Sequence, residues 1–110
     1  MTKLKDVLAF TALLTNLAYK VYENGMVRAI VMTLPNFTTA TKVNQIDILD
    51  EDGNAIYTNT NGGAGWAENA TYLITNLAIP VDKEFQFKMT LDAAAGGTHD
   101  TTVKLFVESM

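Results

Sequence analysis

A strict alternation of apolar and polar residues runs from Glu84 to Leu91, and it limits what the chain can fold into more than any other feature. Phe85, Phe87, Met89 and Leu91 occupy the odd positions, and a polar residue stands at every even position. Successive side chains of a β-strand point to opposite faces of its sheet, whereas a helix would scatter these four residues around its circumference. The pattern therefore predicts a half-buried strand with one face in the core.

The end of the chain repeats this alternation with one exception. Val103, Leu105 and Val107 fall on one face of the expected strand, and Lys104 falls on the other. Phe106 breaks the pattern because it shares the polar face with Lys104. Two interpretations are open: the N-terminal strand covers Phe106, or Phe106 contacts another subunit. We therefore name it as a candidate interaction residue.

Turn signals divide the rest of the chain into further short strands. The segment Asp50–Asn54 supplies an Asp-Gly pair and an Asn, which tolerate the backbone of a tight hairpin turn. The apolar run Met26–Leu34 is typical of a central strand, and Pro35 ends it because proline lacks a ladder donor. Leu77–Val81 leads through Pro80 toward the next strand. The strands that we expect, about eight, cover residues 6–14, 18–23, 26–34, 45–49, 55–58, 71–75, 84–91 and 102–107.

The N-terminal segment has an alternative interpretation. A helical stripe could be formed there by Leu4, Val7, Leu8, Thr11 and Leu14. We prefer two strands with a break at Asn16, because Asn24–Gly25 then supplies a turn directly before the central strand. The basic and apolar residues at this end also resemble a signal peptide, but Asp6 interrupts the basic-to-apolar junction and Thr15 and Asn16 follow the apolar run at once.

Eight short strands on 110 residues indicate an all-β fold. We predict a small antiparallel β-sandwich, immunoglobulin-like or jelly-roll, that forms a single domain over residues 1–110. A small barrel fits the spacing less well.

Charge and composition exclude several classes of partner. Twelve acidic residues outnumber eight basic ones, and seven of the eight are lysines spread along the chain, so no clustered positive surface for nucleic acid is expected. Cysteine is absent, which excludes disulfides, thiolate metal sites and a cysteine nucleophile. No apolar run approaches the roughly 20 residues of a membrane-spanning helix. We expect neither a nucleic-acid nor a membrane partner.

The residues for catalysis or cofactor binding are sparse. His99 is the only histidine, and the only serine is Ser109 near the chain end, so we predict no catalytic residues and no enzyme activity. Asp50–Asn54 resembles the start of a calcium loop, but Gly53 stands fourth instead of sixth and Asn61 stands where the twelfth residue should be glutamate. We interpret this segment as a hairpin turn and predict no metal and no cofactor.

Trp66 is the second candidate interaction residue. It is the only tryptophan, and it lies in the glycine-rich segment 62–67, which we expect to be a loop. An exposed tryptophan can anchor a protein interface or stack on a sugar ring, together with Tyr57 or Tyr72. The alternative is that Trp66 folds back and closes one end of the sandwich.

The order of these features resembles the small virion proteins of tailed bacteriophages, of the capsid-decoration or accessory head type. The likeness extends over a threonine-rich first strand ending near 15–19, the central strand that follows, the hairpin 46–57, the alanine-glycine segment 93–97 and the last strand 103–107. The resemblance implies a non-enzymatic structural protein of the virion that binds the major capsid protein or another virion protein, often as a homo-oligomer. A carbohydrate-binding or adhesin-type β-sandwich module is the alternative hypothesis.

Overall fold

The computed structural model describes residues 2–11, 16–37, 41–92 and 100–109, and over these residues it contains strands and no helix. No described helix is therefore available to cross a membrane. The ten strands are β1 (Thr2–Thr11), β2 (Asn16–Tyr22), β3 (Gly25–Leu34), β4 (Lys42–Leu49), β5 (Ala55–Asn59), β6 (Trp66–Ala67), β7 (Ala70–Ile74), β8 (Ile79–Val81), β9 (Glu84–Leu91) and β10 (Asp100–Ser109).

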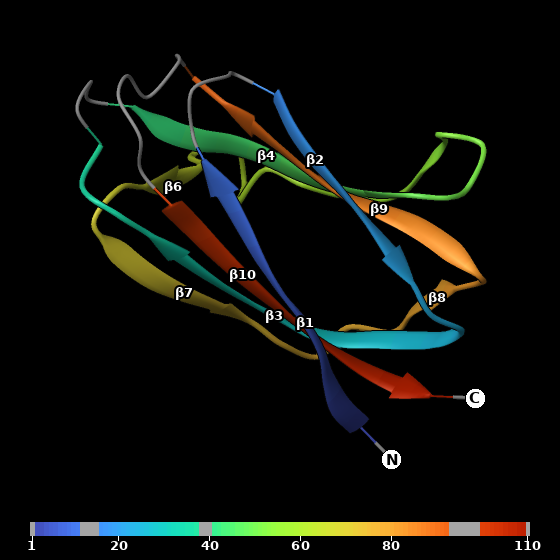
Figure 1. The fold of residues 1–110 in the computed structure, drawn as a ribbon. Helices are drawn as coiled ribbons and strands as arrows, with labels where there is room; N and C mark the ends of the chain where they lie inside the picture. The colour runs from blue at the N-terminus through green and yellow to red at the C-terminus, as the bar shows by residue number, and fades with distance from the viewer. Residues whose placement is uncertain (1, 12–15, 38–40, 93–99, 110) are drawn as a thin grey trace.

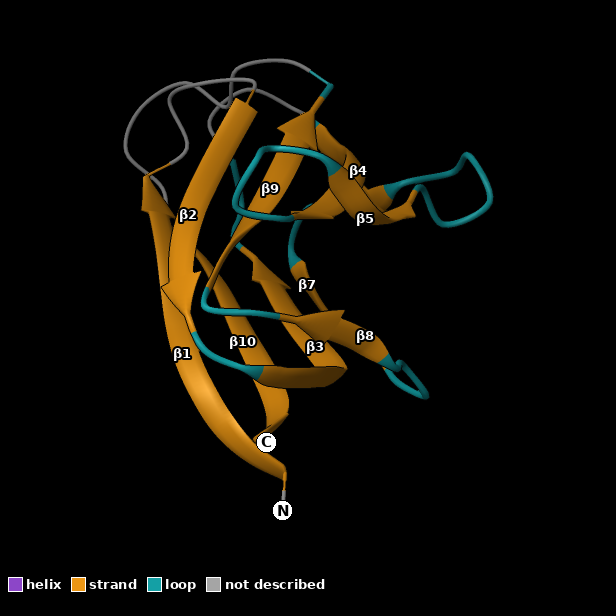
Figure 2. Ribbon diagram, turned by 90° about the vertical axis from the view of Figure 1, so that its right-hand side faces the viewer, coloured by secondary structure: helices purple, strands orange, loops and turns teal. Residues whose placement is uncertain are grey.

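The strands form two antiparallel sheets that pack face to face (Figures 1 and 2). One sheet has the order β1-β10-β3-β7, and β8 pairs with the remaining length of β3. The other has the order β2-β9-β4-β5, and β6 pairs with β4. We call them the first and the second sheet. The predicted all-β sandwich is confirmed.

Strand pairing decides between the two predicted topologies. The first strand pairs with the last, β1 with β10, and inside that pair β2 pairs with β9, β3 with β8 and β4 with β5. The chain is thus a long antiparallel ribbon of nested strand pairs, and the consecutive pairs β1–β10 and β2–β9 lie in different sheets. A ribbon wrapped in this way over two sheets is the jelly-roll. An immunoglobulin-like order is excluded.

The alternation of apolar and polar residues in the sequence matches the alternation of buried and half-buried residues in the strands. In β9 every odd residue from Phe85 to Leu91 is buried and every even one is half-buried. In β10 the side chains of Val103, Leu105 and Val107 have no exposed surface. Both sheets contribute to one apolar cluster between them. We estimate that each fully buried apolar side chain contributes about 1.5–3 kcal/mol relative to an exposed one.

The hairpin between β4 and β5 forms at the predicted residues. The Asp50 N–H donates to the Asn54 carbonyl at 2.8 Å, and the Gly53 N–H donates to the Asp50 carbonyl at 3.0 Å. Gly53 has a φ of +86°, which glycine adopts without a Cβ penalty. One carboxylate oxygen of Asp50 accepts from the N–H groups of Asp52 and Asn54, both at 2.9 Å. The acidic tip is therefore stabilised by its own backbone donors.

The structure refines the predictions for the N-terminal segment, the central strand and the number of strands. The N-terminal segment forms the strands β1 and β2, so the helical alternative is wrong. Met26–Leu34 lies within β3, which is central because it pairs with β10 on one side and with β7 and β8 on the other. The described residues contain ten strands and not eight, because Trp66–Ala67 and Ile79–Val81 form short strands of their own.

The two ends of the chain lie side by side. Thr2 is the register partner of Glu108 across the β1–β10 pair. Figure 1 shows both termini at the same end of the sandwich.

Candidate interaction surface

Trp66 lies in the core and not on an exposed loop. Only 4% of its surface is accessible, and it belongs to β6, whose residues Trp66 and Ala67 pair with Val43 and Lys42 of β4. The preceding Gly65 has a φ of +67°, and a Cβ built there would lie 2.4 Å from the Val43 carbonyl oxygen. Because glycine lets the backbone approach β4 this closely, the indole turns inward. Of the two interpretations of Trp66, the structure agrees with the one in which it folds back against the sandwich, and the exposed anchor is wrong.

The two tyrosines that we grouped with Trp66 are also half-buried against the core. The Tyr72 hydroxyl donates to the Ala67 carbonyl at 2.8 Å, and the Tyr57 hydroxyl accepts from the Asn59 side-chain amide at 2.8 Å. Both rings are held by these contacts. Tyr57, Tyr72 and Trp66 therefore do not form the exposed stacking platform that the carbohydrate hypothesis required.

Phe106 lies on the outer face of the first sheet. Its neighbours Leu105 and Val107 are fully buried, so the alternation of β10 turns Phe106 away from the core. It is half-buried, and its register partners are Leu4 of β1 and Ala29 of β3. The break in the sequence pattern thus marks an aromatic side chain on the outside of the sheet.

A second cross-strand row on the same face is apolar on β7 and β3 and charged on β10, where Lys104 is exposed. Leu73 of β7 pairs with Val31 of β3, and Val31 pairs with Lys104 of β10. Leu73 is 65% exposed, which makes it the most exposed of the large apolar residues whose side chains are described. Phe106, Ala29, Val31 and Leu73 together define what we call the outer apolar face. Sequence reasoning found Phe106 but missed Leu73, because an isolated leucine in a strand gives no signal of the side it faces.

Charged and hydroxyl side chains border the outer apolar face. The Arg28 guanidinium binds the Glu108 carboxylate through Nη2 at 2.5 Å and Nε at 3.0 Å. These hydrogen bonds, together with the attraction between the two charges, lower the pKa of Glu108 below its usual range. On the other side the hydroxyls of Thr33 and Thr71 lie 3.2 Å apart. An apolar centre with a polar rim is typical of protein interfaces.

The outer face of the second sheet has a different character. Asp47 is 5% exposed, and its carboxylate accepts from the Thr58 hydroxyl at 2.6 Å and from the Gln45 side-chain amide at 3.0 and 3.1 Å. Its register partner on β9 is Lys88. Lys20 and Glu84 form an ion pair at 3.1 Å on the same sheet. The exposed apolar side chains of this sheet, Tyr19, Tyr22 and Ile56, lie on its two edge strands β2 and β5, which β9 and β4 separate.

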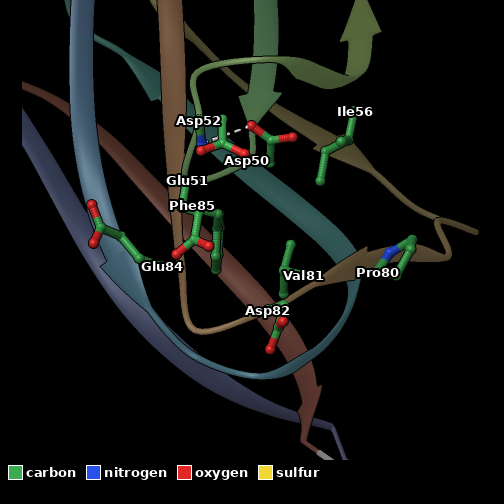
Figure 3. Close-up of a pocket in the computed structure, with 9 residues that line it drawn as sticks. All are labelled: Asp50, Glu51, Asp52, Ile56, Pro80, Val81, Asp82, Glu84 and Phe85. Atoms are coloured by element: carbon green, nitrogen blue, oxygen red, sulfur yellow. Dashed lines mark hydrogen bonds between the residues drawn. The ribbon is translucent and has the colours of Figure 1, made fainter.

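An acidic pocket of about 210 Å³ lies where the β4–β5 hairpin approaches β8 and the start of β9 (Figure 3). Five carboxylates line it: Asp50, Glu51, Asp52, Asp82 and Glu84. Among the described residues, no group of three or more carboxylate or histidine side chains is arranged to hold a metal ion. Figure 3 shows the hydrogen bond from the Asp52 backbone N–H to the Asp50 carboxylate, which therefore stabilises the hairpin turn. His99 lies outside the described residues.

Comparison with protein families and curated proteins found no match. Solved structures do match. A chain of the cyanophage Pam1 capsid asymmetric unit aligns over 96% of this chain and 81% of its own length, with a TM-score of 0.50 and 19% identity. A chitosan-binding module of a Paenibacillus sp. IK-5 chitosanase/glucanase aligns over 91% and 74%, with a TM-score of 0.51 and 12% identity.

Larger proteins contain the same fold as one part. An α-L-fucosidase of Bacteroides thetaiotaomicron aligns with 92% of this chain at a TM-score of 0.54 and 8% identity. The chain spans only 22% of the length of that protein. At these identities the similarity shows the jelly-roll fold, which capsid proteins, sugar-binding modules and enzyme domains share.

Proposed function

We propose that the chain is a non-enzymatic structural subunit of a virion that docks on a capsid lattice through its outer apolar face. The observation that carries this proposal is the placement of Phe106 and Leu73 on the outside of a sheet whose inner face is already filled. Neither side chain contributes to the core between the sheets. Apolar surface on the outside of a sheet gains free energy when a partner covers it.

The shape of this face suits a broad protein partner better than a small ligand. Its residues come from three neighbouring strands: Phe106 of β10 pairs with Ala29 of β3, and Leu73 of β7 pairs with Val31 of β3, whose partner on β10 is Lys104. The Arg28–Glu108 pair and the threonine hydroxyls at the border supply polar contacts. A small patch gives a modest affinity for one site, but a subunit that also binds its neighbours on a lattice gains avidity.

The size of the structural matches also supports the proposal. The cyanophage Pam1 capsid chain is covered to 81% by this chain, whereas the fucosidase is covered to 22%. A compact jelly-roll of this size is thus found as a chain of its own in a capsid. The virion location and the capsid partner rest on this comparison and on the resemblance in sequence pattern.

Co-sedimentation of the purified protein with intact phage particles, isolated from the same source as the protein, tests the proposal. We expect the wild-type chain to pellet with particles and Phe106→Lys to lose most of this binding. Tyr22→Lys is the matched control, because Tyr22 is 63% exposed but lies on β2 of the second sheet. A wild-type chain that stays in the supernatant, or equal loss with both variants, would contradict the proposal.

Carbohydrate binding is the second candidate, and the match to the chitosan-binding module favours it. Because the predicted platform around Trp66 is absent, this function would need other aromatic residues, of which Tyr22 is the most exposed among the described side chains. A glycan array that includes chitosan oligosaccharides separates the two candidates. A hit that Tyr22→Ala abolishes and Phe106→Lys leaves unchanged would favour the sugar over the capsid.

A further inference from the structure

The edge strands of the two sheets differ in how they are protected. The first sheet ends in β1 and β7, and the second ends in β2 and β5. An edge strand presents backbone N–H and C=O groups to any other strand, and proteins block such pairing with bulges, charges or proline.

Three edges contain at least one. The β1–β10 register shifts between Leu4 and Asp6, and the β4–β5 register shifts between Ile48 and Leu49, so β1 and β5 are irregular. Strand β2 carries Lys20, which forms an ion pair with Glu84. Strand β8, which lies beside β7 along β3, contains Pro80.

Strand β7 contains none of them. Its sequence, Ala-Thr-Tyr-Leu-Ile, has neither charge nor proline, and its pairing with β3 runs from Ala70 to Ile74 without a register shift. The uncharged stretch extends from Asn69 to Val81. Figure 2 shows β7 on the far side of its sheet from β1, and no described strand pairs with its outer edge. A regular, uncharged, β-prone edge is a template for strand addition.

We propose that β7 pairs antiparallel with β7 of a second copy of the chain, about a two-fold axis at Tyr72. Residues directly opposite in an antiparallel pair point to the same face. Tyr72 is half-buried on the inner face of the sheet and Leu73 lies on the outer face, so they cannot face each other in a continuous sheet. An axis at Tyr72 satisfies this condition and pairs all five residues of the strand.

The sequence of β7 is compatible with pairing to the same strand of a second copy. A two-fold axis sets each strand against its own sequence, so a charged strand would repel itself, and β7 has no charge to repel. In this register Thr71 lies opposite the partner's Leu73. The pairing therefore covers part of the side chain that is 65% exposed in the single chain. The contact is small compared with standard interfaces, so we expect a weak dimer.

The test uses the chain alone, so its failure and the failure of the capsid proposal are separate results. Sedimentation velocity over a concentration series up to about 1 mM, where association is weak but measurable, should show a monomer–dimer equilibrium. Amides 70–74 should gain protection from hydrogen exchange as the dimer forms. Leu73→Lys should weaken the dimer about ten-fold, because it places like charges at the junction.

Two further variants make the register testable. Thr71→Glu should also weaken self-association, whereas a mixture of Thr71→Glu with Leu73→Lys should restore it, because glutamate then faces lysine across the axis. Ile56→Lys is the matched control, since Ile56 is 42% exposed on β5 of the other sheet. A wild-type chain that stays monomeric, a dimer unaffected by Leu73→Lys, or a mixture without recovery would overturn the proposal, even if β7 accepted a strand of another protein.

Discussion

At the scale of single residues, the outward-facing side chains divide into those whose polar groups are satisfied and those whose apolar surface is left open. Asp47 has its carboxylate occupied by Thr58 and Gln45, although it lies on the outside of a sheet. Phe106 and Leu73 have no comparable role inside the chain. The sequence pattern identified Phe106 because it interrupts an alternation, but it could not place Trp66, whose burial depends on the close approach of Gly65 to β4.

The Arg28–Glu108 pair gives a prediction for pH. Since Arg28 lowers the pKa of Glu108, the folded state binds this proton less readily than the unfolded state. The pair therefore stabilises the fold at neutral pH, and this contribution is lost as the pH falls through the lowered pKa of Glu108. Arg28→Gln should return the carboxyl pKa toward its usual value. A carboxyl NMR titration measures both values, and equal pKa values in the two proteins would contradict the prediction.

At the scale of elements, local signals in the sequence were sufficient to locate most strands but insufficient to predict which strands pair with each other. The odd residues of β9, the Asp-Gly turn at residues 50–54 and the stop at Pro35 could all be read from a few neighbours in sequence. β6 was missed because it is two residues long and pairs with β4 across a glycine-rich segment. Its existence depends on a tertiary contact that has no periodic pattern.

Gly65 allows a direct test of that contact. Gly65→Ala should lower the free energy of unfolding by about 2–5 kcal/mol, because it adds a left-handed backbone penalty to a clash with the Val43 carbonyl. Gly53→Ala is the control: its φ is +86°, but a Cβ there meets nothing within 4 Å, so about 1–2 kcal/mol is expected. Urea denaturation followed by Trp66 fluorescence measures both. Equal losses would show that the approach of β6 to β4 is not constrained by Gly65.

At the scale of the whole molecule, the nested pairing of strands joins the start of the chain to its end. Period-two patterns predicted a two-layer sandwich but could not choose the jelly-roll, because alternation says which face of a strand is buried and not which strand lies beside it. That choice is made by pairs such as Thr2 with Glu108, which are distant in sequence.

Such pairing should make folding slow for a chain of 110 residues. Closing the outermost strand pair costs loop entropy before its contacts form, and domains dominated by distant pairings fold in about milliseconds to seconds. Stopped-flow refolding by Trp66 fluorescence should fall in this range. Agreement of the kinetic and equilibrium stabilities is the control for two-state folding. Refolding faster than a millisecond would show that local structure governs the rate.

The neighbouring positions of Thr2 and Glu108 also govern how the protein could be extended. A polypeptide fused before β1 and another fused after β10 would emerge from the same pole of the sandwich. If the outer apolar face binds a particle, both fused polypeptides would leave the contact area on the same side. The fold is thereby suited to presenting two cargoes together, or to splicing the whole unit into a surface loop of a host protein with little spacing between the joints.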